Sequence, residues 1–290
     1  MTPHRIIDAH HHLWDLAVRP QPWITGAALA PLARSFSLAD LTPEASAAGV
    51  VGTVVVQTVC VAGETPELLA LAHRSDLIAG VVGWTDLTAP DVAERIAELR
   101  ASPGGDRLVG IRHQIQDEPE PAWLLRPDVH RGLLAVAEAG LTFDLVITPH
   151  QLPAATLAAS RLTSLTFVLD HCGKPPIATG AHDLWATRLR RLAALPNTVC
   201  KLSGLVTETA HSWRAEDLVP YADTVLDAFG PRRVLFGSDW PVCTLKADYG
   251  DIVHLTERLT GSVSPADQET IFLHNAIRIY GLRPPRKRSV

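Results

Sequence analysis

Short apolar runs rich in β-branched residues recur along the whole chain, and this recurrence most constrains its fold. A stretch with a helical pattern, rich in alanine and leucine, follows each run. Runs that are apolar throughout, without alternation, are typical of strands buried on both faces of a parallel sheet. The predicted strands span residues 5–8, 52–58, 77–84, 107–112, 141–147, 165–170, 197–202 and 233–237.

The segments between these strands carry helix start and stop signals. Thr65, Pro66 and Glu67, for example, predict a helix start with a cap, a proline in the first turn and an early acid. The other predicted helices span 40–48, 92–100, 129–139, 153–160, 184–195, 215–229 and 247–259. Eight strands that are each followed by a helix predict an α/β protein with a (β/α)8 barrel, or TIM barrel. One extra C-terminal helix, over 265–280, is expected to cover one end of the barrel or an outer groove.

The length of 290 residues and the 47% hydrophobic content suit a single large barrel, which we expect to span residues 1–282. A basic segment, 283–290, is predicted to be a flexible, solvated tail. The net charge of -5 gives no electrostatic case for binding nucleic acid or an anionic membrane. No apolar run approaches the roughly 20 residues that cross a bilayer.

The predicted location is the cytoplasm. The first strand begins within a few residues of Met1, which leaves no room for a signal peptide. The four cysteines form no CxxC pair, as expected of free thiols in a reducing compartment. A long loop over 13–35 follows the first strand. It is expected to be either part of a substrate lid, or a loop that covers the barrel floor or contacts a second subunit. The sequence does not decide between a monomer and a homodimer.

His10 and His12 lie two residues apart on the first predicted strand. Side chains on a strand alternate between its faces, so these two imidazoles are expected to point the same way, and His11 the opposite way. Two imidazoles at this spacing form a chelating pair that suits a divalent metal. For His11 we favour a structural role.

Polar residues follow the other predicted strands at the same end of the barrel, where enzymes of this fold have their active sites. Ionisable residues behind buried strands are costly unless they face a polar cavity, so their concentration predicts an enzyme. Asp239 is the best candidate for a general base, because partial desolvation tunes a carboxylate for proton transfer. The guanidinium of Arg112 suits a substrate carboxylate or carbonyl. The strand ends also supply Gln114, His150, His171, Lys201 and Trp240, and the loop supplies Trp14.

Four motifs in order resemble the amidohydrolase superfamily. They occupy residues 8–15 (DAHHHLWD), 110–113 (GIRH), 170–175 (DHCGKP) and 237–241 (GSDWP). Within that superfamily the set is similar to the amidohydrolase-related branch, which contains sugar lactonases, and above all to its L-fuconolactonase and L-rhamnonolactonase group. The resemblance covers essentially the whole chain. It implies a (β/α)8 barrel that hydrolyses a cyclic ester.

The resemblance also implies site residues. His10 and His12 match the histidine pair of strand one, His171 the histidine of strand six, and Asp239 the aspartate of strand eight. Binuclear members bridge two metals with a lysine or glutamate from strand four, but this chain has Arg112 and His113 there. We therefore expect either no required cofactor or one divalent ion, zinc or manganese, held by His10, His12 and Asp239.

The predicted reaction opens a sugar lactone to its acid. Asp239 would activate water, while His10, His12 and His171, with or without a metal, polarise the carbonyl. The predicted substrate-binding residues are Arg112, Gln114, Lys201, Trp14, Trp240 and His150. One alternative is a metal-dependent decarboxylase of the same superfamily. A third, less favoured alternative is a non-catalytic barrel that binds a sugar acid.

Overall fold

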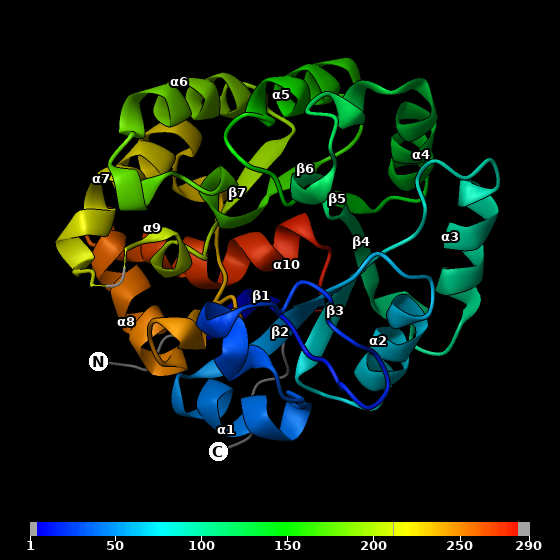
Figure 1. Cartoon of the computed structure of the whole chain (residues 1–290), viewed down its shortest axis with the longest axis horizontal. Helices are drawn as coiled ribbons and strands as arrows, with labels where there is room; N and C mark the ends of the chain where they lie inside the picture. The colour runs from blue at the N-terminus through cyan, green and yellow to red at the C-terminus, as the bar shows by residue number, and fades with distance from the viewer. Residues whose placement is uncertain (1–4, 211, 284–290) are drawn as a thin grey trace.

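The computed structural model describes residues 5–210 and 212–283, and within them eight parallel strands pair in sequence order (Figure 1). This arrangement confirms the predicted barrel. The predicted tail lies outside the described residues, apart from Arg283. The strands are β1 (Ile6–His11), β2 (Val50–Val56), β3 (Ile78–Gly83), β4 (Leu108–His113), β5 (Thr142–Leu145), β6 (Phe167–Leu169), β7 (Thr198–Leu202) and β8 (Val234–Phe236).

The barrel closes where β1 meets the chain just beyond β8. The N–H of Asp239 donates to the carbonyl of His10 at 2.8 Å, and the N–H of His12 donates to the carbonyl of Trp240 at 2.7 Å. Behind this seam the buried carboxylate of Asp8 accepts hydrogen bonds from the backbone and the hydroxyl of Ser238. The ring is thus joined at the residues predicted to do the chemistry.

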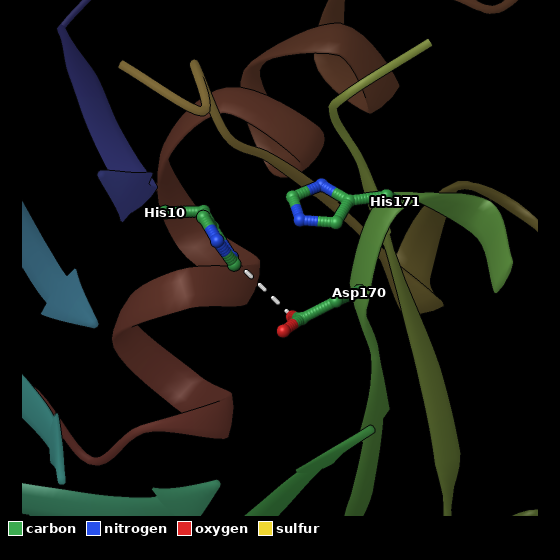
Figure 2. A group of neighbouring side chains, drawn as sticks. All are labelled: His10, Asp170 and His171. Atoms are coloured by element: carbon green, nitrogen blue, oxygen red, sulfur yellow. Dashed lines mark ion pairs between the residues drawn. The ribbon is translucent and has the colours of Figure 1, made fainter. Parts of the chain in front are cut away.

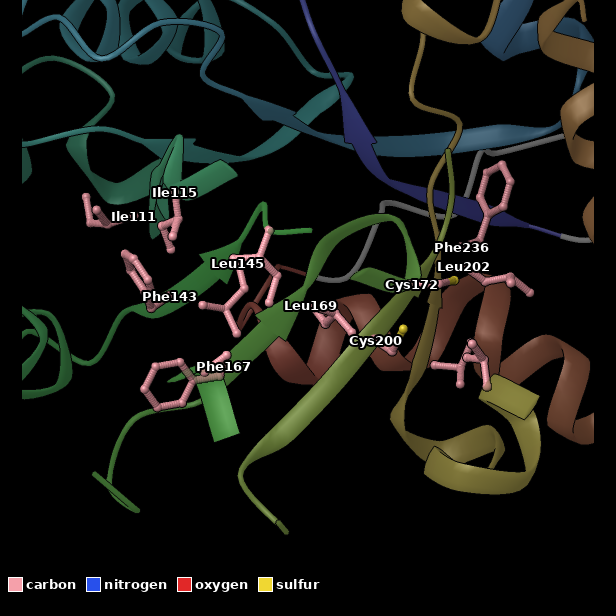
Figure 3. Packing of buried hydrophobic residues seen from close by; sticks show 14 of the residues in the cluster. Ile111, Ile115, Phe143, Leu145, Phe167, Leu169, Cys172, Cys200, Leu202 and Phe236 are labelled. Carbon is pink, nitrogen blue, oxygen red and sulfur yellow. The ribbon is translucent and has the colours of Figure 1, made fainter. Parts of the chain in front are cut away.

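Helices surround the strands on the outside (Figure 1). Apolar side chains fill the space between the two layers, and Figure 3 shows Phe143 and Phe167 among them, with ring centroids 6.2 Å apart. Such burial drives the sheet and helices together at roughly 25 cal/mol per Å² of apolar surface removed from water. The helices are α1 (Leu38–Ala47), α2 (Glu64–His73), α3 (Val92–Ala101), α4 (Pro127–Glu138), α5 (Leu152–Arg161), α6 (His182–Ala193), α7 (Ala215–Phe229) and α8 (Tyr249–Leu259).

Two helices begin earlier than predicted. α1 starts at Leu38 because Ser37 forms a capping box with Asp40. α2 starts at Glu64, and the predicted cap residue Thr65 does not cap it. The Thr65 hydroxyl instead bonds the backbone of Trp84, which ties the helix to the end of β3.

The predicted C-terminal helix is divided into α9 (Pro265–Glu269), a π-helical turn (Thr270–His274) and α10 (Asn275–Ile279). Leu273 and Ala276 of this segment, together with Tyr280, pack in one buried cluster with Ile7 of β1 and Leu235 of β8. The segment therefore covers the amino-terminal end of the barrel, which is one of the two predicted positions. In Figure 1, α10 lies in red across the ring of strands. Among the described residues, no helix combines the length and apolar content that crossing a bilayer requires.

Candidate active site

A cavity of about 700 Å³ lies at the carboxyl-terminal end of the barrel, and five predicted site residues line it: His12, Arg112, Gln114, His171 and Asp239. Pro22 and Trp23 reach it from the long loop after β1, so this loop forms part of the cavity wall. Trp14 anchors the loop by pairing its backbone with that of Phe36. The remaining lining residues are Thr58, Val59, Cys60, Val61, His113, Gln116, Asp117, Glu118, Val146, Lys174, Thr207, Glu208 and Val242.

His10 and His12 point the same way, and His11 points outward. The Nε2 atoms of His10 and His12 are 3.1 Å apart. The Nδ1 atom of His12 lies 2.8 Å from the carbonyl oxygen of Val56. A carbonyl only accepts, so this Nδ1 carries the proton and Nε2 of neutral His12 is a lone pair that faces the site. His11, by contrast, bonds the hydroxyl of Thr53 at 2.9 Å.

Asp239 lies at the centre of the histidine group. Its Oδ1 atom is 3.6 Å from Nε2 of His12, and 3.8 Å from Nε2 of both His10 and His171. Asp239 and His171 adopt left-handed backbone conformations, with φ of 58° and 50°. Such conformations are uncommon for residues other than glycine and cluster at functional sites. The Nδ1 atom of His171 is fixed by the hydroxyl of Ser203 at 3.0 Å.

Burial and charge set the protonation states of these groups. Burial lowers the pKa of His171 to about 4, so this imidazole is neutral near pH 7. Burial, reinforced by the positive charge of Lys201, holds the pKa of His10 well below its usual range. Burial by itself disfavours the Asp239 carboxylate, but His171 and His12 outweigh it and lower the pKa of Asp239. The neutral imidazoles of His10 and His171 thus lie beside an ionised carboxylate.

A group of charged side chains lies beneath His10, and one of them, Arg112, also reaches the cavity wall. Lys201 Nζ is 2.6 Å from Asp144 Oδ2 and 2.9 Å from Asp170 Oδ1, and all three side chains are fully buried. Arg112 Nη1 pairs with Asp170 Oδ2 at 3.0 Å. The hydroxyl of Tyr280 donates to Asp144 at 2.7 Å. Figure 2 shows Asp170 facing His10, 3.3 Å from its Nδ1 atom. We call Lys201, Asp144, Asp170, Arg112 and Tyr280 the lower network.

The structure separates the predicted substrate-binding residues into two groups. Arg112 and Gln114 line the cavity, together with the predicted catalytic residues His12, His171 and Asp239. Lys201, Trp14, Trp240 and His150 are absent from its lining. Lys201 is fully buried in the lower network, and Trp14 and Trp240 pack on either side of Phe36. His150 is exposed and contacts Thr148. These four placements do not fit direct contact with a substrate in this cavity.

Four charged residues that the sequence analysis did not select also line the cavity: Asp117, Glu118, Lys174 and Glu208. Glu118 accepts from His113 Nε2 at 2.7 Å, and His113 is held by the indole N–H of Trp84, which donates to its Nδ1. Lys174 follows β6 and Glu208 follows β7, and both line the cavity. Burial raises the pKa of Glu208. Lys174 belongs to the 170–175 motif, which was a usable signal. Glu118 lies five residues beyond the end of β4, which gives no comparable signal.

The residues present fit one divalent metal. Ligand atoms of His10, His12 and Asp239 lie within 4.8 Å of one another, and all three residues are buried. Nitrogen and carboxylate oxygen are donors that zinc accepts. A second group, His10, Asp170 and His171, meets the same distance limit, but Asp170 is already paired with Arg112 and Lys201.

A cavity lies at the carboxyl ends of the eight barrel strands. One histidine at the end of β1, a second just after it, a third after β6 and an aspartate after β8 gather at this end, as in barrel enzymes. The chain belongs to the amidohydrolase family, whose model matches residues 7–282.

The comparisons refine this assignment. An L-fucono-1,5-lactonase of Burkholderia multivorans is 41% identical and covers 96% of this chain and 97% of its own. A second L-fucono-1,5-lactonase, from Burkholderia ambifaria, is 36% identical over 96% of each chain. A crystal structure of an amidohydrolase from Burkholderia multivorans with bound zinc is 40% identical, with a TM-score of 0.90 over 96% of this chain and all 100% of that one. A 2,6-dihydroxybenzoate decarboxylase shares the fold, with a TM-score of 0.67 at 14% identity.

Proposed function

We propose that this protein hydrolyses a sugar lactone to the corresponding aldonic acid, and that an L-fucono-1,5-lactone is the first substrate to test. The observation that carries the proposal is the convergence of Asp239, His12 and His171 in one cavity, with Asp239 Oδ1 at 3.6 and 3.8 Å from the two imidazoles. Whole-length similarity to two L-fucono-1,5-lactonases supports the substrate class.

Asp239 acts as the general base in this proposal. Its lowered pKa keeps the carboxylate ionised near pH 7, so it accepts a proton from the attacking water. The water oxygen adds to the lactone carbonyl, and the ring C–O bond then breaks. Asp239 returns the proton to the departing ring oxygen, so the products are a carboxylic acid and a free hydroxyl group.

The surrounding cations and imidazoles stabilise the negative charge that develops on the carbonyl oxygen. His171 is neutral, and with its proton on Nε2 it offers an N–H donor beside Asp239, while its Nδ1 atom accepts from the hydroxyl of Ser203. Arg112 brings a permanent positive charge to the cavity wall. Preorganised donors of this kind are worth about 3–4 kcal/mol each in other enzymes. A divalent metal held by His10, His12 and Asp239 would supply Lewis-acid polarisation of the same oxygen.

The cavity wall fits a ring that carries several hydroxyl groups. Gln114, Gln116 and Glu118 offer acceptors and donors from the segment after β4. Trp23 offers an apolar face from the long loop. Polar groups that bind hydroxyls, next to an aromatic surface, are a common way to hold a small polar ring. The decarboxylase alternative has no comparable support, because similarity at 14% identity shows the fold alone.

The test measures acid release from L-fucono-, L-rhamnono-, L-galactono- and D-arabinonolactone by chelator-treated enzyme, with and without added zinc or manganese. Turnover of at least one lactone, lost in Asp239→Asn, supports the proposal. Absence of turnover on all four under every metal condition contradicts it and favours the decarboxylase alternative, which carbon dioxide release from aromatic acids would then detect.

A further inference from the structure

Lys201 has a position that the proposed chemistry does not use. Its side chain is fully buried at the end of β7, and its ammonium nitrogen lies 3.0 Å from Nδ1 of His10. The same nitrogen contacts Asp144 at 2.6 Å and Asp170 at 2.9 Å. Two buried carboxylates therefore hold a positive charge directly against the ring of His10.

The contact between Lys201 and His10 fixes which ring nitrogen carries the proton. An ammonium group only donates hydrogen bonds, so Nδ1 of His10 must accept. A neutral imidazole carries one proton, and in His10 that proton then lies on Nε2. The direction of a single hydrogen bond thus assigns the tautomer of His10.

The next contacts continue in the same direction. Nε2–H of His10 faces Nε2 of His12 at 3.1 Å. The Nε2 atom of His12 is a lone pair, because its Nδ1–H donates to the carbonyl of Val56 at 2.8 Å. Lys201, His10, His12 and Val56 therefore form one chain of hydrogen bonds in which every donor meets an acceptor.

The opposite tautomer of His10 uses longer contacts. It would donate from Nδ1 to Asp170 Oδ1 at 3.3 Å and accept at Nε2 from Arg112 at 3.4 Å. It would also bring two donors together, Nζ of Lys201 and Nδ1–H of His10, at 3.0 Å. The Nε2 atoms of His10 and His12, 3.1 Å apart, would then both carry lone pairs and repel each other. Asp170 Oδ1 already has the ammonium group of Lys201 as an ion-pair partner at 2.9 Å, closer than Nδ1 of His10. The shorter contacts favour the tautomer with the proton on Nε2.

We propose that Lys201 is a positioning residue that holds His10 as the Nε2–H tautomer. His10 then presents a hydrogen-bond donor to the site, whereas His12 presents an acceptor. A divalent metal needs lone pairs on both Nε2 atoms. For the metal to bind, the proton of His10 must move from Nε2 to Nδ1. Lys201 must then give up its hydrogen bond to Nδ1 of His10. Lys201 therefore weakens metal binding at His10, His12 and Asp239.

The first experiment is a ¹⁵N spectrum of the histidine side chains in chelator-treated wild-type protein, with His10 assigned by its loss in His10→Gln. We expect a protonated Nε2 and an unprotonated Nδ1 for His10. The reverse assignment would overturn the proposal. This measurement needs no substrate, so its failure is distinct from failure of the lactone assay, and only the donor role of His10 toward a carbonyl rests on the proposed function.

The second experiment uses Lys201→Met, which removes the donor and its charge. We expect His10 to change to the Nδ1–H tautomer, and zinc to bind about tenfold more tightly, measured by competition with a chromophoric chelator. Lys246→Met is the matched control, because Lys246 lies outside the cavity lining and its ammonium group donates to the carbonyl of Ala210. In that control we expect an unchanged tautomer and a change in zinc affinity below about threefold.

Unchanged zinc affinity and an unchanged His10 tautomer in Lys201→Met would contradict the proposal. Unchanged ¹⁵N signals of His11 and His182 in this variant would show that it is folded. If Lys201→Met does not fold, Lys201→Gln replaces it with a neutral group of similar length. The wild-type spectrum decides the tautomer in either case.

Discussion

The lower network and the cavity wall use the same kinds of residue for opposite purposes. In the lower network two cations and two carboxylates are buried and pair with each other. On the cavity wall Glu118, Lys174 and Glu208 face open volume. The comparison teaches that a charge which is fully paired fixes geometry, whereas a charge with free hydrogen-bonding capacity is available for a ligand. Asp239 lies between the two regions, and the predictions below test this division.

The largest effect is expected where the two regions meet. Asp239→Asn keeps the size of the side chain but removes the base, so we expect kcat to fall by about 10³–10⁴-fold while KM changes little. Steady-state lactone hydrolysis measures this effect. Ser238→Ala, next to it in the chain, serves as a control for disturbance of the β8 end. Near-normal turnover in Asp239→Asn would remove Asp239 from the base role.

In the lower network we expect the main loss to be stability. Asp170→Asn leaves Lys201 and Arg112 short of a counter-charge, and removing one partner of a buried ion pair costs about 3–5 kcal/mol of unfolding free energy. Burial by itself disfavours the Asp170 carboxylate, but Lys201 and His10 outweigh it and hold its pKa well below the usual range. Urea denaturation measures the loss.

Asp144→Asn is the matched control for that prediction. Burial is the largest influence on Asp144 and raises its pKa even though Lys201 is adjacent, so its charged form is the less favoured of the two carboxylates. We expect this variant to lose less unfolding free energy than Asp170→Asn. A larger loss of unfolding free energy in Asp144→Asn than in Asp170→Asn would show that Asp144, not Asp170, contributes more to stability.

Protonation of the buried site histidines at acidic pH should lower the free energy of unfolding. The folded pKa of His171 is about 4, against an ordinary value of 6.5, because burial disfavours its charged form. Between these values the unfolded chain binds the extra proton, so stability falls as pH drops from 6.5 towards 4, by up to about 1.4 kcal/mol per pH unit. Urea denaturation at pH 7, 6 and 5 measures the slope. In His171→Gln the slope should decrease, and an identical slope would show that His171 does not contribute to it.

The smallest effect is expected on the cavity wall. Glu118→Gln keeps the acceptor for His113 but removes the negative charge, so we expect kcat/KM to fall by about tenfold and unfolding free energy to change by less than about 0.5 kcal/mol. Glu120→Gln, on an exposed neighbour outside the cavity lining, should change neither quantity. A stability loss in Glu118→Gln comparable to that of Asp170→Asn would erase the distinction between the two regions.

The barrel was predictable because the same two signals recur along the sequence. Each buried strand is a continuous apolar run, and each helix between strands has a local start or stop signal. Individual boundaries were less predictable. The start of α2 was misplaced because the Thr65 hydroxyl bonds the backbone of Trp84 on another element, and such a tertiary contact leaves no local pattern. The π-helical turn within 270–274 likewise has no clear signal in the sequence.

In the site, alternation along the first strand was enough to predict that His10 and His12 point the same way. The same reasoning could not tell that Lys201 lies beneath His10 while Lys174 lies on the cavity wall. Lys201 lies within β7, near its carboxyl end, whereas Lys174 follows β6. The depth of each side chain depends on how its strand sits in the barrel and on the left-handed backbone at Lys174. Depth within a barrel is a property of all eight strands together, which no single stretch encodes.

Tyr280, whose hydroxyl bonds Asp144, has a consequence for the order in which a new chain matures. A ribosome releases the eight strands well before residue 280, so the sheet can assemble while the lower network still lacks this partner. The charged layer under His10 is completed only when the last helix docks. Catalytic competence is therefore expected to arrive at the end of synthesis, after the barrel itself, and a chain truncated before Tyr280 should carry an unfinished site.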